Sequence, residues 1–283
     1  MKRVTRFAPS PTGYLHVGHA YSASLAYRQA VESDGHFLLR IEDIDGTRCR
    51  SEFEQGIYED LNWLGLKWEE PVRRQSEQFE DYAAILERLS EENLIYPCFC
   101  TRREIAEEIA RSDSAPHGPD GPLYHGTCKQ LSDSEREKLF QGNSPYALRL
   151  DMDKAMAVPG AQDLTFNELG KGQIACNPAK FGDIVLARKE TPTSYHLAVT
   201  FDDALQGVNL VVRGQDLFEA THVQRLLQHL LQLPVPDYLH HGLVSDTKGR
   251  RLAKRDKGAT IRSLREKGYT PEEVMKLAGF GKN

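Results

Sequence analysis

Two histidines lie three residues apart near the start of the chain, directly after a turn. Residues 6–19 read Arg-Phe-Ala-Pro-Ser-Pro-Thr-Gly-Tyr-Leu-His-Val-Gly-His, so a strand-like segment ends in proline and glycine and a helix begins at the histidines. This junction suits a phosphate group, because the unpaired N–H groups of a helix N-terminus attract anions. His16 and His19 could donate to phosphate oxygens, and Gly18 leaves space for a flat base. A pair of histidines with this spacing is more often part of a surface turn, so the pair alone does not establish a phosphate site.

A basic segment near the other end of the chain could act on the same phosphate. Residues 250–255 read Arg-Arg-Leu-Ala-Lys-Arg, and Thr247 to Gly258 hold six basic residues and one acid. The glycines predict a mobile loop that could close over a polyphosphate and neutralise charge in the transition state. Taken in isolation, a solvated basic loop is the simpler interpretation.

Three of the five cysteines are clustered. Cys98, Cys100 and Cys128 fall within 31 residues, which in a reducing compartment favours a metal or free thiols over disulfides. Three thiolates begin a tetrahedral zinc site but leave it one ligand short. General chemistry favours His117 or His125 as the fourth ligand, because imidazole is a commoner zinc ligand than phenolate. The alternative is three reduced thiols without a metal.

Length and composition describe an ordinary globular protein. The 283 residues suffice for about two domains, or for one domain with an insertion. The contents of hydrophobic residues (40%) and charged residues (27%) argue against disorder, and the net charge of -5 excludes a histone-like binder, so RNA would need a local basic patch. No apolar run approaches the ~18 residues of a membrane span, and the N-terminus lacks a secretory signal. We therefore expect a cytoplasmic protein without a membrane partner, in which the isolated Cys49 and Cys176 are buried.

Strand and helix patterns alternate over the first hundred residues, which predicts a βαβ unit and a parallel sheet. The segment from Ser112 to Gly126 differs, because it holds three Pro and three Gly, and it reads as an irregular insertion. Periodicity predicts strands at Val4–Ala8, Phe37–Ile41, Tyr146–Leu150, Asp183–Ala187, His196–Thr200 and Leu210–Val212. It predicts helices at Ala20–Ser33, Ser51–Leu64, Phe79–Glu92, Ala220–Leu231, Thr260–Lys267 and Pro271–Leu277.

The histidine pair and the basic segment, in this order and about 230 residues apart, resemble the HIGH and KMSKS signatures of class I aminoacyl-tRNA synthetases. Residues 6–18, together with Leu-Arg-Ile-Glu-Asp-Ile-Asp at 39–45 and Val-Arg-Gly-Gln-Asp at 212–216, resemble the glutamyl-tRNA synthetase subgroup. These motifs span nearly the whole chain but stop where such a synthetase continues into an anticodon-binding half. The arrangement is similar to the glutamyl-Q tRNA(Asp) synthetases, which activate glutamate and attach it to the queuosine base of tRNA(Asp).

A pocket selective for free glutamate needs two fixed cations for its carboxylates and one anion for its ammonium group. Arg6, Arg213 and Glu42 supply that set. Other roles are open: Glu42 could cap a helix, Arg213 could pair with Asp216, and Tyr195 could belong to the core. The resemblance implies that the glutamate contacts come from Arg6, Phe7, Ala8, Pro9, Ser10, Glu42, Tyr195 and Arg213.

The resemblance also implies an ATP site and a metal site. His16, Gly18, His19 and Lys254 would act on ATP, with Mg²⁺. A Cys-x-Cys followed by Tyr-x-x-x-Cys implies one structural zinc held by Cys98, Cys100, Tyr124 and Cys128, with Tyr124 in place of a histidine. The chain departs from the family in its loop, where Ala253 stands for the usual serine and Arg255 for a serine or glutamine, so a hydroxyl contribution to phosphate binding is lost.

We therefore expect an α/β fold with a doubly wound, parallel-sheet, Rossmann-type nucleotide-binding domain. Its expected parts are a catalytic domain (1–95 and 146–245), a small zinc-bearing insertion facing the tRNA (96–145), and the KMSKS-like loop with short C-terminal helices (246–283), without an anticodon-binding domain. The expected function is ATP-dependent, tRNA-independent activation of glutamate and its transfer to queuosine in tRNA(Asp), by a monomer. The alternatives are a discrete glutamyl-tRNA synthetase that charges the tRNA 3′ end, and a catalytically silent RNA-binding paralogue.

Overall fold

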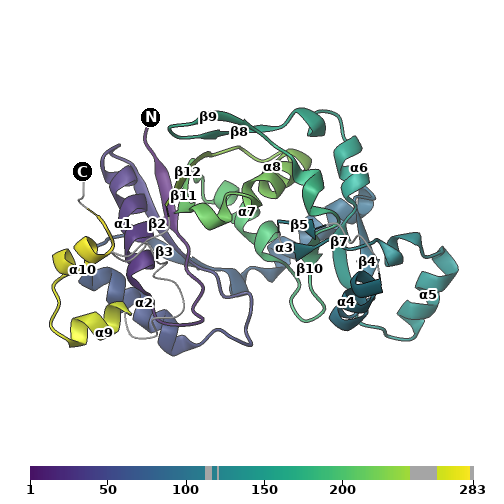
Figure 1. Ribbon diagram of the computed structural model, residues 1–283, viewed down its shortest axis with the longest axis horizontal. Coiled ribbons are helices and arrows are strands. Elements are labelled where there is room, and N and C mark those ends of the chain that lie inside the picture. The colour runs from purple at the N-terminus through teal and green to yellow at the C-terminus, as the bar shows by residue number, and fades with distance from the viewer. Residues whose placement is uncertain (112–116, 120, 243–259, 281–283) are drawn as a thin grey trace.

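The computed structural model describes residues 1–111, 117–119, 121–242 and 260–280 (Figure 1). The strands are β1 (Val4–Phe7), β2 (His36–Ile41), β3 (Glu69–Arg74), β4 (Ile95–Cys98), β5 (His117–Gly118), β6 (Gly121–Pro122), β7 (Ala147–Leu150), β8 (Thr165–Glu168), β9 (Gly172–Ala175), β10 (Val185–Ala187), β11 (Leu210–Gly214) and β12 (Asp237–His241). The α-helices are α1 (Val17–Val31), α2 (Ser51–Trp63), α3 (Phe79–Glu91), α4 (Arg102–Arg111), α5 (Asp133–Gln141), α6 (Met152–Ala157), α7 (Tyr195–Leu205), α8 (Ala220–Leu230), α9 (Ile261–Glu266) and α10 (Pro271–Leu277).

The predicted parallel sheet is present. Strands β1, β2 and β3 pair in parallel, and β11, β12 and β8 form a second parallel group that ends in the antiparallel strand β9. The two groups meet edge to edge, because the Asn209 N–H donates to the Val4 carbonyl over 3.1 Å and the Val4 N–H donates to the Asn209 side chain over 2.8 Å (Figure 1). The carboxyl ends of β1, β2 and β11 therefore share one edge, where ligands bind in open α/β sheets.

Helices cover both faces of this sheet. Successive side chains of a strand point to opposite faces, and in β1 the Thr5 hydroxyl donates to the Ala26 carbonyl of α1 over 2.8 Å, whereas Arg6 pairs with Asp203 of α7. Helix α1 therefore lies on one face and α7 on the other. The α1 face packs buried Ala23 and Ala26 against the apolar residues of β1 and β2.

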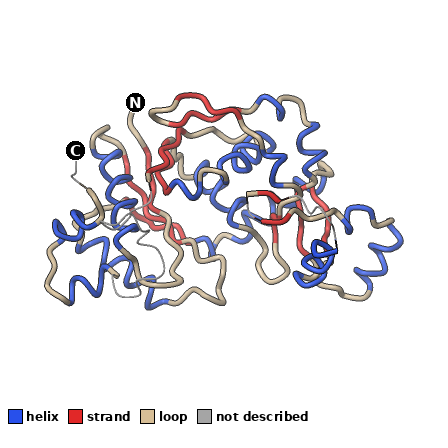
Figure 2. The backbone as a smooth tube through the Cα atoms, in the orientation of Figure 1, coloured by secondary structure: helices blue, strands red, loops and turns tan. Residues whose placement is uncertain are grey.

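A separate three-stranded antiparallel sheet, ordered β10-β7-β4, lies at the other end of the molecule from the C-terminal helices (Figure 2). Strands β4 and β7 pair from Ile95 with Leu150 to Cys98 with Ala147. The chain between Cys98 and Ala147 therefore leaves and re-enters through neighbouring positions of one strand pair, and this segment carries the cysteine cluster.

One predicted element is wrong. The strand expected at His196–Thr200 belongs to helix α7, whose first turn is capped by the Ser194 side chain accepting from the Leu197 N–H. The run is short, apolar and rich in β-branched residues, so its periodicity does not separate a buried strand from a buried helix. The helical assignment matters, because it places Asp202 and Asp203 under the sheet. Among the described helices, none is long and apolar enough to cross a membrane.

Candidate active site

The loops that follow β1 and β2 are held together at the carboxyl edge of the sheet. The Glu42 N–H, one residue past β2, donates to the Pro9 carbonyl over 3.0 Å. Phe7 and Pro9 are buried, whereas the Ser10 side chain is exposed, with its Oγ 3.9 Å from the Cys49 Sγ. The candidate glutamate segment after β1 thus lies directly beside Glu42.

Arg6 is buried, and its guanidinium group is held by contacts with α7 and β11. Its Nε donates to the Asp203 Oδ1 over 2.9 Å, and its Nη1 donates to the Val212 carbonyl over 3.3 Å. The same Asp203 oxygen accepts from Arg40 Nη2 over 2.7 Å. Burial opposes ionisation of Asp203, but Arg6 and Arg40 outweigh it and hold the pKa of Asp203 below its ordinary value. One carboxylate therefore orients two buried guanidinium groups, and Glu42 and Asp202 add negative charge beside Arg40.

Arg213 is also buried and held from behind. Its Nε donates to His240 Nε2 over 3.0 Å and its Nη2 donates to the Thr221 hydroxyl over 2.7 Å. Among the described residues, Arg213 forms no ion pair with Asp216, so that alternative interpretation is wrong. A guanidinium has five N–H donors, and Arg6 and Arg213 each donate two hydrogen bonds to described residues, so further donors can meet a ligand.

Glu42 and Tyr195 complete this group. Glu42 does not cap a helix; its carboxylate lies 3.4 Å from Arg40 Nη2. Burial raises the pKa of Glu42 to about 7, although Arg40 and Arg6 oppose the shift. Burial also raises the pKa of Tyr195, and the charges of Arg213 and Glu42 act on the same phenol. The structure therefore brings the two predicted arginines, the acid and the tyrosine to one place.

The histidine pair forms the N-terminus of α1. The Gly18 N–H donates to His16 Nδ1 over 3.1 Å, the His16 N–H donates to His19 Nδ1 over 3.2 Å, and the rings stack with centroids 3.8 Å apart. Burial lowers the pKa of both rings, that of His19 to about 3. Because each neutral ring accepts at Nδ1, its proton is on Nε2. A Cβ on Gly18 would lie 3.0 Å from the His16 ring, which explains the glycine.

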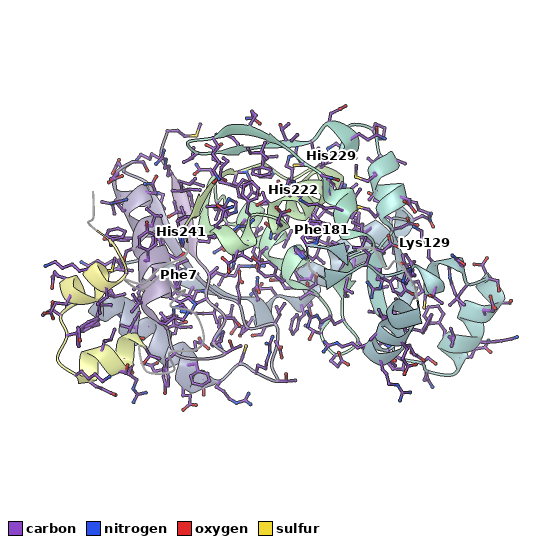
Figure 3. The ribbon with its side chains drawn as sticks, in the orientation of Figure 1. Phe7, Lys129, Phe181, His222, His229 and His241 are labelled. Carbon is purple, nitrogen blue, oxygen red and sulfur yellow. The ribbon has the colours of Figure 1, made fainter. Side chains whose placement is uncertain are left out.

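The predicted ATP-binding Lys254 lies outside the described residues, as do Ala253 and Arg255, but the flanks of their segment are placed. Before it, β12 ends at His241, which is labelled in Figure 3. The His241 ring contacts Tyr21 of α1 at a centroid distance of 5.0 Å. After it, Thr260 pairs with His16 in an isolated β-bridge. Both flanks therefore lie beside the histidine helix.

The cysteine cluster is compact. The sulfurs of Cys98, Cys100 and Cys128 lie within 4.8 Å of one another. The Tyr124 hydroxyl lies 3.4 Å from Cys100 Sγ and accepts from the Cys128 N–H over 2.8 Å, and the Arg149 guanidinium carbon lies 4.1 Å from the centre of its ring. His125 is exposed. Zn–S bonds of about 2.3 Å place sulfurs about 3.8 Å apart, so the three cysteines could hold a metal ion, with the Tyr124 hydroxyl beside them.

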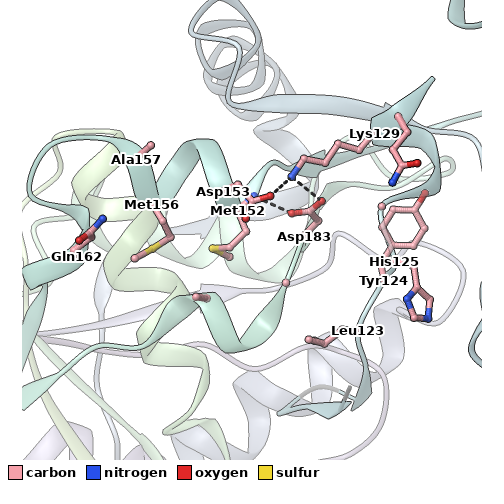
Figure 4. Close-up of a pocket in the computed structure, with 14 residues that line it drawn as sticks. Leu123, Tyr124, His125, Lys129, Met152, Asp153, Met156, Ala157, Gln162 and Asp183 are labelled. Carbon is pink, nitrogen blue, oxygen red and sulfur yellow. Dashed lines mark hydrogen bonds and ion pairs between the residues drawn. The ribbon is translucent and has the colours of Figure 1, made fainter. Parts of the chain in front are cut away.

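A network of charges joins the cysteine cluster to the antiparallel sheet. The Lys129 amine, next to Cys128, lies 2.6 Å from Asp151, 2.7 Å from Asp153 and 3.7 Å from Asp183, beside a pocket of about 730 Å³ (Figure 4). Tyr124 and Tyr195 both line a smaller pocket of about 290 Å³. This pocket therefore borders a residue of the cluster and a residue of the arginine site.

Sequence reasoning missed the residues behind the arginines, namely Arg40, Asp203, Thr221, His240 and Glu168. The available signal was a charged residue inside an apolar run, as in Leu39-Arg40-Ile41. The prediction that the isolated Cys49 and Cys176 are buried is also wrong, because both side chains are half-buried.

The sequence-family model named "tRNA synthetases class I (E and Q), catalytic domain" matches residues 2–280 of this chain. A Rhodobacter capsulatus protein named glutamyl-Q tRNA(Asp) synthetase is 47% identical, over 98% of this chain and 100% of that protein. A glutamate–tRNA ligase from Aquifex aeolicus is 40% identical over 96% of this chain and 55% of that protein. The crystal structure of a glutamate–tRNA synthetase from Elizabethkingia anophelis matches with a TM-score of 0.83 and 28% identity, over 98% of this chain and 61% of that one. The chain thus spans little more than half of these two larger proteins.

Proposed function

Since the chain belongs to the class I tRNA synthetases of the glutamate and glutamine type and is a ligase of that family, we propose that it activates glutamate with ATP and transfers it to the queuosine base of tRNA(Asp). The observation that carries the amino-acid assignment is the pair of buried arginines, each fixed through its Nε, that faces Glu42 and Tyr195. Two oriented cations and one anion complement the two carboxylates and the ammonium group of glutamate. The queuosine assignment is supported by the names of relatives.

The reaction has two steps. A glutamate carboxylate oxygen bonds to the α-phosphorus of ATP as the bond to the β-phosphate oxygen breaks, which gives glutamyl-adenylate and pyrophosphate. The oxygen of an acceptor hydroxyl then bonds to the acyl carbon and gives up its proton to water, as the bond from the acyl carbon to the phosphate oxygen breaks and AMP leaves. The Nε2–H groups of His16 and His19 would donate to phosphate oxygens, together with Lys254 and with Mg²⁺ as counter-ion. This is catalysis by positioning and electrostatic stabilisation.

The cysteine cluster with Tyr124 would hold a structural zinc, because three thiolates and one phenolate oxygen would supply the four ligands of a tetrahedral site. The zinc would fix the shape of residues 96–145, which we place against the tRNA, on a monomeric catalytic body formed by residues 1–95 and 146–245.

Transfer of labelled glutamate tests this function. With ATP, the protein is expected to label total tRNA from cells that make queuosine and not tRNA from cells that cannot. Equal labelling of both pools would identify a glutamyl-tRNA synthetase that charges the 3′ end, which the glutamate–tRNA ligases among its relatives favour. Absence of labelling and of glutamate-dependent ATP–pyrophosphate exchange would indicate a silent RNA-binding paralogue.

The affinity for glutamate is expected to rise with pH. Glu42 must be ionised to pair with the substrate ammonium group, and burial raises its pKa to about 7 in the free protein. If only the ionised form binds, the KM for glutamate at pH 6 should exceed that at pH 8 about tenfold, because protonation of Glu42 competes with substrate. Pyrophosphate exchange without tRNA at both pH values measures the ratio.

The matched control for this pH effect is Glu42→Gln, which cannot ionise. It should show a high KM for glutamate that is nearly the same at both pH values. A wild-type KM that does not change between pH 6 and pH 8 would remove Glu42 as the ammonium partner.

A further inference from the structure

A buried acid, Glu168, is linked to Arg213 through the ring of His240. Glu168, at the end of β8, accepts through Oε2 from His240 Nδ1 over 2.7 Å and through Oε1 from the His240 backbone N–H over 2.9 Å. His240 in turn meets Arg213 Nε over 3.0 Å. Glu168 is 1% exposed and Arg213 is 5% exposed, so water does not compete for these contacts.

The hydrogen-bonding chemistry of Glu168 and Arg213 fixes the tautomer of the His240 ring that lies between them. A carboxylate only accepts hydrogen bonds and a guanidinium only donates them. His240 must therefore carry its proton on Nδ1 and offer the lone pair of Nε2 to Arg213. Burial and the charge of Arg213 lower the pKa of His240 to about 4, which is consistent with a neutral ring. The proton on Nδ1 is the link through which Glu168 acts on Arg213.

The contacts also fix the direction of the guanidinium. His240 takes the Nε–H of Arg213, and Thr221 takes one N–H of Nη2. Toward the residues that the structure describes, the remaining three of its five donors, including both on Nη1, make no hydrogen bond, and we assign them to a carboxylate. If the ring changed its tautomer, the N–H on Nε2 would face the Arg213 Nε–H, and if the ring flipped, a C–H would face it; in either case the acceptor that fixes this orientation would be lost.

We propose that Glu168 is a positioning residue for glutamate recognition, acting on Arg213 through the tautomer of His240. The inference rests on the proposed function, because it takes Arg213 to bind a substrate carboxylate. It assigns a specificity role to β8, a strand that carries none of the family motifs and lies more than 40 residues from β11 in the sequence.

The test is Glu168→Gln. His240 offers two donors to this position, and a glutamine has one acceptor oxygen, so its amide N–H opposes one donor or forces the other tautomer. A lost hydrogen bond to a charged group costs about 1.5–3 kcal/mol, so the KM for glutamate in ATP–pyrophosphate exchange should rise at least about tenfold. The KM for ATP should stay within about twofold, because the histidine helix is untouched. Glu137→Gln, at an exposed position, is the matched control.

A second variant, His240→Asn, keeps the inference testable if Glu168→Gln does not fold. In His240→Asn the amide N–H can still donate to Glu168, while the acceptor for Arg213 is gone, so this variant should fold and show the same selective rise in the KM for glutamate. A wild-type KM for glutamate in either folded variant, or equal rises for glutamate and ATP, would overturn the inference. Absence of exchange in the wild-type protein would instead refute the proposed function.

Discussion

Replacing Asp203 with asparagine is expected to lower the free energy of unfolding by about 3–5 kcal/mol. Its carboxylate is shared by Arg6 at 2.9 Å and Arg40 at 2.7 Å, and both guanidinium groups are buried. An asparagine of the same shape keeps an acceptor oxygen but removes the charge that both cations face. Asp202 compensates only in part: its Oδ2 lies 3.9 Å from Arg40 Nε, but its oxygens already accept hydrogen bonds from Arg73 and Tyr82.

Urea denaturation at neutral pH measures this loss, read as a lower midpoint at constant slope. Asp163→Asn, at an exposed position, is the matched control and should change the stability by less than about 0.5 kcal/mol. A loss below about 1 kcal/mol for Asp203→Asn would show that Asp202, Glu42 and the sheet carbonyls balance the two arginines without Asp203. Because Arg6 also loses its orientation, the KM for glutamate should rise in the same variant.

The Asp203 network behind Arg6 and the Glu168 network behind Arg213 show which residues the sequence alone could not identify. Arg6, Glu42 and Arg213 stand in short motifs in or next to strands, and their types complement glutamate, so they could be named as candidates from the sequence. The groups that fix them could not, because Asp203 and Glu168 are brought to the arginines by folding. Arg6 and Asp203 are separated by 197 residues, and a separation of that kind leaves no local pattern to recognise.

The error at α7 has the same origin. The apolar run before Asp202 and Asp203 fits a buried strand or a buried helix, and the two acids argued for neither. They are tolerated there because Arg6, Arg40 and Arg73 arrive from β1, β2 and β3. The parallel sheet was predictable because alternating strand and helix patterns are local, whereas the ion pairs beneath it depend on the tertiary structure.

His16→Asn is expected to lower the rate of glutamate-dependent ATP–pyrophosphate exchange by about 100-fold to 1,000-fold, with little change in stability. The ring has two functions that separate by atom: Nδ1 accepts from the Gly18 N–H and caps α1, while Nε2 carries the proton that we assign to a phosphate oxygen. An asparagine places Oδ1 where Nδ1 stood and is a good helix cap, but it has nothing in place of Nε2. Loss of one preorganised donor to a developing charge typically costs a factor of this size.

His16→Ala separates the two functions, because it removes the cap as well. Its exchange rate should fall as far as that of His16→Asn, and it should also lose about 1 kcal/mol of stability, which thermal unfolding of the two variants measures. The KM for glutamate should stay near the wild-type value in both, since the arginine site keeps all of its contacts. If His16→Asn exchanged within about threefold of wild type, the N-terminus of α1 would be a structural cap, and the phosphate would have to be bound by His19 and the basic segment alone.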